Sequence, residues 1–473
     1  AEKGIVVTST NSLTIYAQSG GTGTLNATGT TDSSNNASAG IGGSTSSVDS
    51  GSITIHGGII NATGGGQSRY YGGAGIGGGT SKSANGGSSG AIIIYDGTVT
   101  ANSGAGDATG AGIGGGGSEQ GSGGSGNDIT IYGGSVTASS TGTGTGGAGI
   151  GGGGGLTGGG AGNNIQIYGG TINATGSNRG AGIGGGGSVT IYDSSYKAGD
   201  GAITISGGEV TAVGGDYAAG IGGGGGYQNT YGGCTGGTGS VTISGGIVDA
   251  SSPTDVYYAD YKGDPIGNGG NTTAAATVNK TTGIVFENGA GTVCGDVTLD
   301  GSYTVPADYT LNIPAGASLS GSGTLSGGSA FTTENLTEDM ISVPEDWHYT
   351  GEDRTADITT KLSGELDKGV AICGQTFTVS GWTLAVAKTD DLTYTATYTN
   401  NNDNTNTFTK TITLQKSGTD LTSEGKVQTY KGDTLTKDFT ASDTITVKAT
   451  PTATGQAPAN SAMFAASFTG PGA

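Results

Sequence analysis

The sequence is poor in most of the features that soluble proteins rely on for folding and binding. Only 32% of its residues are hydrophobic and 6% aromatic, and 17 basic residues face 37 acidic ones, for a formal net charge of −20. With so few Lys and Arg residues, the chain lacks the positively charged surface that binds the phosphates of DNA or RNA, so we expect no nucleic-acid partner. The same charge disfavours an anionic membrane surface. No apolar run approaches about 18 residues, so we expect no membrane insertion by this chain.

Cysteine and proline are also scarce, with 3 and 8 copies. Cys234, Cys294 and Cys373 are an odd number in three different regions, and their spacing determines no pairing. No Cys-His or other metal-ligand spacing is present. Low hydrophobicity combined with high net charge is typical of disorder, but the pattern of glycines argues against that interpretation.

Glycine is abundant and unevenly placed, because most of the 105 glycines lie between positions 1 and 270. This part is an internal repeat of three short elements. The first element, of the type Ile-Thr-Ile-Tyr, begins at Leu13, Ile53, Ile92, Ile129, Ile165, Ile203 and Val241. The second, of the type Val-Thr-Ala, begins at Leu25, Ile60, Val99, Val136, Ile172, Val210 and Val248. The third, Ala-Gly-Ile-Gly-Gly, centres on Ile41, Ile76, Ile113, Ile150, Ile183 and Ile221, with a degenerate copy at Ile266.

A fixed period of this length is the signature of a solenoid. The elements are short, β-branched and alternating, which indicates strands rather than helices. We therefore predict an all-β protein whose residues 1–270 form a parallel β-helix of about seven coils. The crossover rule makes it right-handed. Because side chains alternate along a strand, the first and third residues of each element point into the coil. There Ile stacks on Ile and Val on Val in successive coils, and the burial of each of these side chains contributes roughly 1.5–3 kcal/mol.

The character of the sequence changes after position 270. Residues 271–330 keep strand patterning without the repeat unit, which predicts a C-terminal cap of the β-helix. Residues 345–416 alternate strongly around an Asn/Asp-rich turn, which predicts an immunoglobulin-like β-sandwich. Residues 417–473 carry further strand signals and are interpreted as a second, partial module of the same kind.

Taken together, these motifs resemble a known group of proteins. The repeated Gly-Ala-Gly-Ile-Gly-Gly-Gly unit, the Gly-Asp-Val-Thr-Leu segment at 295–299 and the modules that follow are similar to adhesin-like surface or secreted proteins of gut Firmicutes. The resemblance covers essentially the whole chain. It implies a right-handed β-helix followed by bacterial Ig-like domains, exported to the cell envelope.

Candidate catalytic residues are few. The repeat offers one histidine, His56, in a column otherwise held by tyrosines, where a position at the edge of a coil is the simpler interpretation. A glycoside hydrolase needs two carboxylates roughly 5–10 Å apart. Only Glu209 and Asp249 lie on strands, in adjacent coils and offset by two positions. A solvated surface is the simpler interpretation of this pair, although a carboxylate pair is geometrically allowed.

We expect no cofactor other than structural calcium, for which Asp side chains in the acidic loops are suitable ligands. The segment from Gly123 to Ile131 nearly matches the nonapeptide that binds calcium in parallel β-rolls, with Asp128 at the acidic position. However, Thr130 replaces the aliphatic residue, and the next coil carries Asn164 instead of Asp. Asp128 is therefore a weak metal candidate.

The aromatic residues form two sets. Tyr16, Tyr95, Tyr132 and Tyr168 recur at one position of the repeat and should stack as an outer ladder, either for stability or as a rail on which sugar rings stack. Loops between the second and third elements should gather another set at coils five to seven, either as a ligand-binding patch or as ordinary loop packing. This patch consists of Arg179, Asp216, Tyr217, Asp255, Tyr257, Tyr258, Asp260 and Tyr261.

These observations favour a non-enzymatic adhesin or binding protein, with no catalytic residue assigned. We expect a monomer at the surface or cell wall of a Gram-positive bacterium, or secreted from it, that recognises a glycan or host glycoprotein through the loops of the β-helix. The alternative is a carbohydrate-active enzyme, a glycoside hydrolase or polysaccharide lyase, on the same scaffold. The shortage of outward acids and bases on the strands favours binding. A third alternative, a purely structural stalk, does not explain the aromatic loops of variable length.

Overall fold

The computed structural model describes residues 4–18, 21–45, 49–67, 71–189, 195–229, 232–253, 261–344 and 347–415, together with the backbone of 427–431, 434–435 and 445–449. The chain divides into two units. The first comprises residues 1–335 with 372–375, and the second comprises 336–371 with 376–473. Among the described residues, no helix is long and apolar enough to cross a membrane.

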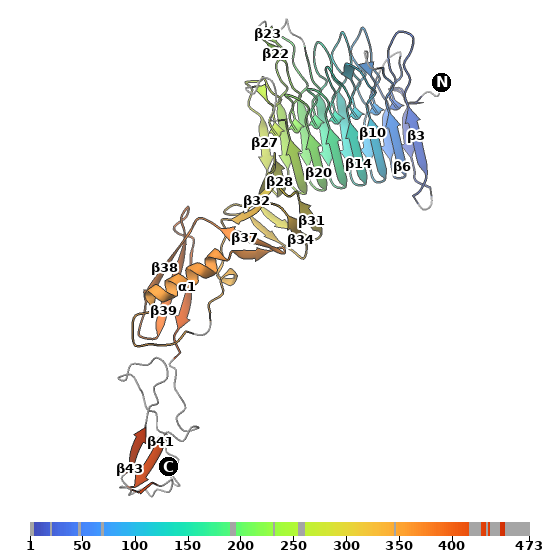
Figure 1. Ribbon diagram of the computed structural model, residues 1–473. Helices are drawn as coiled ribbons and strands as arrows, with labels where there is room; N and C mark the ends of the chain where they lie inside the picture. Colours follow the sequence, from blue (N-terminus) through green and yellow to red (C-terminus); the bar gives the residue numbers. More distant parts are fainter. Residues whose placement is uncertain are drawn as a thin grey trace. The chain divides into compact units, whose positions relative to one another are not determined.

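The first unit begins with a parallel β-helix of three sheets (Figure 1). Sheet 1 contains β2 (Ser12–Ile15), β5 (Ser52–Ile55), β9 (Ile92–Ile94), β13 (Gly126–Ile131), β16 (Gly162–Ile167), β19 (Gly201–Ile205), β24 (Gly239–Ile243) and β27 (Thr277–Lys280). Sheet 2 begins with β3 (Thr24–Thr28), β6 (Ile59–Thr63), β10 (Thr98–Asn102), β14 (Ser135–Ser139), β17 (Thr171–Thr175), β20 (Glu209–Val213), β25 (Ile247–Ser251) and β28 (Gly283–Glu287). Sheet 3 contains β1 (Ile5–Val6), β4 (Ile41–Gly42), β8 (Ile76–Gly77), β12 (Ile113–Gly114), β15 (Ile150–Gly151), β18 (Ile183–Gly184), β21 (Ile221–Gly222) and β26 (Ile266–Gly267).

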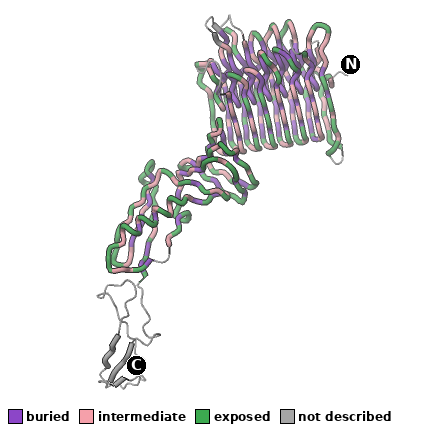
Figure 2. Tube along the Cα trace, viewed as in Figure 1, coloured by how far each residue is buried: buried purple, intermediate pink, exposed green. Residues whose placement is uncertain are grey.

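Seven coils, from β2–β4 to β24–β26, each contribute one strand to every sheet, with β1 before the first coil and β27 and β28 after the seventh. The predicted parallel β-helix of about seven coils is thus confirmed. Consecutive coils pair in parallel with equivalent residues opposite each other, for example Ile129 with Ile165 and Val136 with Ile172. The Ile and Val columns are buried and form one continuous core. Figure 2 shows buried residues recurring at the same place in successive coils. Two short pairs lie in the connecting loops: β7 (Tyr71–Gly72) with β11 (Ala108–Thr109), and β22 (Gln228–Asn229) with β23 (Gly232–Gly233).

The glycines build a second packed layer rather than loose loops. Two columns of glycine backbone hydrogen-bond to each other in a zigzag along the axis, with N···O distances of 2.8–2.9 Å. A Cβ on Gly153 would lie 2.1 Å from the backbone oxygen of Gly116, a distance that no side chain tolerates. We call these columns the glycine stack. It consists of Gly79, Gly87, Gly116, Gly124, Gly153, Gly160, Gly186, Gly199, Gly224, Gly237 and Gly269.

A smaller parallel stack follows β28. The chain reverses at Asn288 and Gly289, both with positive φ, and β29 (Ala290–Cys294) pairs antiparallel with β28. The next strands are β30 (Asp296–Thr298), β31 (Ser302–Val305), β32 (Thr310–Ile313), β33 (Ser318–Ser320), β34 (Thr324–Gly327) and β35 (Ala330–Thr333). Equivalent residues in these coils are 20 to 22 positions apart, as for Asn312 with Thr332 and Ser302 with Thr324. The region 271–330 thus holds the end of the first β-helix and a second, short solenoid.

The core changes sides at β28. Val285 faces the first core, whereas its neighbour Phe286 lies in register with the outward-facing Asp249. Phe286 is nevertheless fully buried, because the rings of Tyr303 and Tyr309 cover it at centroid distances of 6.1 and 5.6 Å. The short solenoid is therefore built on the face of sheet 2 that is polar in the earlier coils.

The second unit corrects the prediction of a β-sandwich over 345–416. The region 336–415 contains the short 3₁₀ helix η2 (Glu338–Met340), the helix α1 (Thr355–Asp367), β36 (Val370–Ile372), β37 (Gln375–Val379), β38 (Trp382–Lys388), β39 (Thr393–Asn400) and β40 (Thr407–Thr413). The last three strands form one antiparallel sheet. Helix α1 contacts β38 and buries Ile358 and Leu362, which are four positions apart on one helical face. A helix thus supplies the layer that the prediction assigned to a second sheet.

In the region 417–473, where a second Ig-like module was predicted, the structure describes three short strands. These are β41 (Val427–Lys431), β42 (Thr434–Leu435) and β43 (Ile445–Ala449), paired antiparallel in the order β42-β41-β43. The rest of that prediction falls outside the described residues.

Candidate functional site

Five aromatic rings form a continuous ladder along one edge of sheet 1. Each ring belongs to the residue that follows a sheet 1 strand, and the parallel register aligns these residues from coil to coil. From coil 1 to coil 5 the ring centroids are 4.5, 4.7, 5.0 and 5.1 Å apart, and the planes differ by only 2–10°. The aromatic ladder consists of Tyr16, His56, Tyr95, Tyr132 and Tyr168.

The ladder confirms the predicted stacking of the tyrosines, and its use as a rail for sugars stays a prediction. The tyrosines are 43–72% exposed. However, the near-parallel planes mean that each inner ring covers the faces of its neighbours. The inner rungs therefore offer solvent their ring edges and, in the tyrosines, their hydroxyl groups. Only the two end rungs have a ring face that no other rung covers. Tyr16 is 72% exposed, whereas Tyr168, at 46%, is no more exposed than the inner tyrosines.

Side chains beside the ladder form an ordered polar surface. The Tyr168 hydroxyl donates a hydrogen bond to Gln166 Oε1 at 2.6 Å, and Gln166 Nε2 donates to Asn164 Oδ1 at 2.6 Å. Asn164 Nδ2 then donates to Asp128 Oδ1 in the previous coil at 2.7 Å. The middle outward residue of each strand adds a further column, which is Thr14, Thr54, Ile93, Thr130 and Gln166 in the first five coils.

Asp128, the weak calcium candidate, has a structural explanation. Asp128 and Asn164 both have positive φ, of 49° and 54°, a conformation that Asp and Asn tolerate better than most residues. They occupy equivalent places in successive coils, so the backbone requirement accounts for the near-match to the calcium nonapeptide. Within the described part of the chain, no group of three or more His, Cys, Asp or Glu residues is placed to hold a metal ion.

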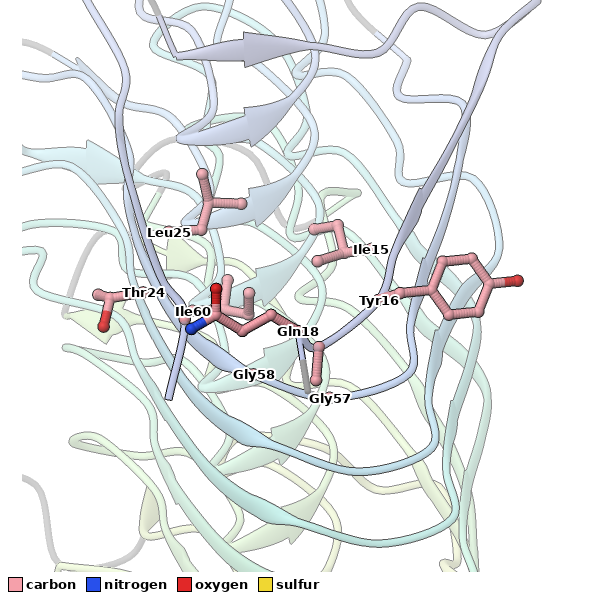
Figure 3. Close-up of a pocket in the computed structure, with 10 residues that line it drawn as sticks. Ile15, Tyr16, Gln18, Thr24, Leu25, Gly57, Gly58 and Ile60 are labelled. Atoms are coloured by element: carbon pink, nitrogen blue, oxygen red, sulfur yellow. The ribbon is translucent and has the colours of Figure 1, made fainter. Parts of the chain in front are cut away.

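The two ends of the ladder differ. Beyond Tyr168 the column continues with serines, and the Ser244 hydroxyl lies 3.2 Å from that of Ser206. At the other end, a cavity of about 190 Å³ opens above the first coil and is lined by Ile15, Leu25 and Ile60 among others. Tyr16, the first rung of the ladder, also lines this cavity, although Figure 3 shows its ring pointing away from Ile15 and Leu25. The cavity is therefore the open end of the aliphatic core and lies next to the first rung of the ladder.

The predicted loop patch is only partly described, because Asp255, Tyr257, Tyr258 and Asp260 fall outside the described residues. Of the others, Asp216 is exposed and Tyr261 is half-buried. Arg179 and Tyr217 are 8% and 7% exposed, so the idea that they present a surface to a ligand needs correction. Burial follows from their position where a loop folds back over the coil.

Arg179 instead organises the packing of two loops. Its guanidinium carbon lies 5.8 Å from the Tyr217 ring centroid and 5.0 Å from that of Tyr227, and Nη1 donates to the Gly144 carbonyl at 2.8 Å. Burial lowers the pKa of Arg179, and nearby Cys234 and Tyr217 oppose this shift. Tyr227 and Cys234 belong to the other class of loop, so the sequence pattern did not place them beside Arg179.

Glu209 and Asp249, the candidate carboxylate pair, lie where sheet 2 meets the short solenoid. Asp249 is half-buried, and its Oδ2 accepts a hydrogen bond from the Tyr309 hydroxyl at 3.1 Å. Burial raises the pKa of Asp249. Burial and the charge of Asp249 raise the pKa values of Tyr303 and Tyr309 to about 12. Glu209 is exposed on the neighbouring strand. The Asp249 carboxyl is thus engaged in the junction rather than facing an open cleft.

Comparison with known proteins supports the fold at the level of single coils. The model of the family described as Beta helix repeat matches residues 53–80, 92–117, 129–154, 165–187 and 203–225. Each matched segment begins in a sheet 1 strand and ends just after a sheet 3 strand, so each corresponds to one of coils two to six. Neither a curated protein nor a solved structure matches the chain. The segments that match this family are therefore five successive coils of the parallel β-helix.

Proposed function

We propose that this protein is a non-enzymatic, glycan-binding protein that acts outside the cell, as an adhesin-like surface or secreted protein of the kind that the sequence resembles. The observation that carries the proposal is the aromatic ladder, whose tyrosines remain 43–72% exposed in a protein with few aromatic residues. Tyr combines an apolar ring with a hydroxyl that donates and accepts hydrogen bonds, a combination that suits sugars. Rigid, stacked rings also lose little conformational entropy when a ligand binds.

The alternative is a polysaccharide-active enzyme on the same fold. The raised pKa of Asp249 beside the exposed Glu209 favours it, because acid catalysis uses one protonated and one ionised carboxyl group. Against it, the Tyr309 hydroxyl occupies Asp249, and the cavity described above lies at the opposite end of the β-helix.

Binding and product analysis on the same polysaccharides separate these functions. We expect binding without released oligosaccharide. The double variant Tyr95→Ser with Tyr132→Ser should weaken binding at least tenfold, while Ser206→Ala with Ser244→Ala, in the same column but outside the ladder, should leave it unchanged. Release of oligosaccharide that disappears in Asp249→Asn would establish the enzyme instead. The absence of binding to any glycan would refute the proposal.

A further inference from the structure

We infer that the ligand of the aromatic ladder is a neutral, extended polysaccharide that runs parallel to the axis of the β-helix, with one sugar unit for each coil. This inference rests on the proposed function and adds the class and orientation of the glycan. Its basis is the spacing, the charge and the exposed chemistry of the ladder surface.

The spacing of the ladder is that of a linear polymer. Strands of adjacent coils lie about 4.8 Å apart, and the ring centroids follow at 4.5–5.1 Å. An extended chain of β-linked pyranose units repeats at nearly the same length. A chain that runs along the axis would therefore meet an equivalent ring edge at every unit, whereas a chain that crosses the coils would meet only one rung.

The charge of the surface favours a neutral chain. Among the ladder residues and the sheet 1 strands of coils one to five, Asp128 is the only carboxylate, and it already accepts a hydrogen bond from Asn164. His56 is the only basic side chain in this set, and Asp96, next to Tyr95, adds a negative charge at the margin. An anionic polysaccharide would find no row of cations here and would be repelled by a protein of net charge −20.

The exposed chemistry favours many small contacts over one strong contact. Stacking covers the faces of the inner rings, so a single sugar cannot lie flat against them. The hydroxyls of the ladder tyrosines, together with those of the threonines in the neighbouring column, can donate and accept hydrogen bonds. The Tyr168 hydroxyl already donates to Gln166 and offers a sugar its acceptor sites. In an extended chain, alternate units turn opposite edges to the protein, so the matching glycan carries hydroxyls on both edges.

This arrangement predicts that affinity grows with chain length. The ladder has five rungs and ends where Ser206 follows Tyr168 in the column, so the gain should stop at about five sugar units. A hydrogen bond worth about 1 kcal/mol corresponds to roughly fivefold in affinity for each added unit.

The experiment uses the full chain and neutral β-1,4-linked gluco-, manno- and xylo-oligosaccharides of two to eight units, with affinities measured by titration calorimetry. Polygalacturonate serves as an anionic comparison and an α-1,4-glucan as a chain that is not extended. We expect at least one neutral series to bind, with affinity rising about fivefold per unit up to five units, and weaker binding of both comparison polymers.

Two variants test the orientation directly. Ser206→Tyr places a sixth ring against Tyr168 and should extend the length at which affinity levels off by one unit. Ser244→Tyr adds the same side chain one coil further on, where Ser206 separates it from the ladder, and should not extend it. Tyr95→Ser, which splits the ladder in the middle, should weaken binding of the longest chain more than Tyr16→Ser, which shortens it by one rung.

Three results would overturn the inference. Binding of a glycan with no dependence on chain length would show recognition of a chain end, and the proposed function would survive. Preference for polygalacturonate would exclude a neutral ligand. Self-association of the protein that is lost in Tyr95→Ser, without glycan binding, would identify the ladder as a contact between copies and would refute both the inference and the function.

Discussion

The first unit contains two parallel stacks of β-strands that reach stability by different means. In the first β-helix the coils carry long loops, and these loops fold back as the glycine stack beside an aliphatic core. In the short solenoid, equivalent residues of successive coils are 20 to 22 positions apart, which leaves too few residues for such loops. Its core uses Leu and aromatic side chains such as Phe286 and Phe331. The glycine stack requires glycine because backbone packs on backbone there. The short solenoid also has close backbone approaches, at Gly321 and Gly323, but its Gly301 lies in open space.

The largest expected effect comes from placing a side chain in the glycine stack. Gly153→Ala would bring a Cβ to 2.1 Å from the Gly116 oxygen, so backbone must move, and we expect a loss of more than about 4 kcal/mol of stability or failure to fold. Gly301→Ala in the short solenoid meets nothing within 4 Å and should change stability by less than about 0.5 kcal/mol. Thermal unfolding followed by circular dichroism measures both. Equal effects of the two substitutions would contradict the comparison.

The second effect concerns the point where the two stacks meet. Phe286→Ala removes a fully buried ring covered by Tyr303 and Tyr309, and it should cost about 3–5 kcal/mol. Because Phe286 faces the short solenoid, hydrogen exchange should accelerate in residues 296–333 and remain slow in the first coils. Ile131→Ala, in the first core, should show the reverse distribution. Uniform acceleration in both variants would indicate that the two stacks unfold as one.

The third expected effect is a smaller loss of stability, which should occur in coils that carry an aromatic rung and not in coils that lack one. Tyr132→Ser removes two stacked ring pairs, each worth roughly 0.2–1 kcal/mol, so stability should fall by about 0.4–2 kcal/mol. Ser206→Ala, at the same position one coil beyond the ladder, should have almost no effect. Urea unfolding of both variants provides the measurement, and an unchanged midpoint for Tyr132→Ser would mean that stacking does not stabilise this surface.

The smallest expected effect is a pH dependence at the junction. Burial raises the pKa of Asp249 in the folded protein above its ordinary value. The folded state therefore holds the proton more tightly, so the stabilising contribution is present below the ordinary pKa and is lost as pH rises through the raised pKa. Asp249→Asn, which cannot ionise, should gain in melting temperature relative to the natural protein between acidic and neutral pH. A difference that stays constant with pH would exclude this titration.

The repeat itself was predictable because its signals are local. A strand alternates its side chains with a period of two, and a repeat of nearly constant length aligns equivalent positions of successive coils. The coil number, the buried Ile and Val columns and the stacking of Tyr95 on Tyr132 all follow from these two facts. His56 belongs to the same column and joins the ladder for the same reason.

The short coils and the helix were harder to predict. The strands between positions 290 and 333 share no repeated sequence motif, so the length of their coils emerges only from their pairing. Helix α1 is rich in Thr and has only Ile358 and Leu362 as buried anchors, so strand-like alternation around it dominated the interpretation.

By itself, the sequence determined the β-helix, its coils and the residues of its ladder, since each of these depends on a short pattern repeated in register. Only the tertiary structure decided how segments that are distant in sequence meet. It placed Arg179 between Tyr217 and Tyr227 from two different loops, and it turned Phe286 away from the first core. It also showed that the inner rings close each other's faces, because ring orientation depends on the neighbouring coils. That orientation moves the expected sugar contacts from the faces of the rings to their edges.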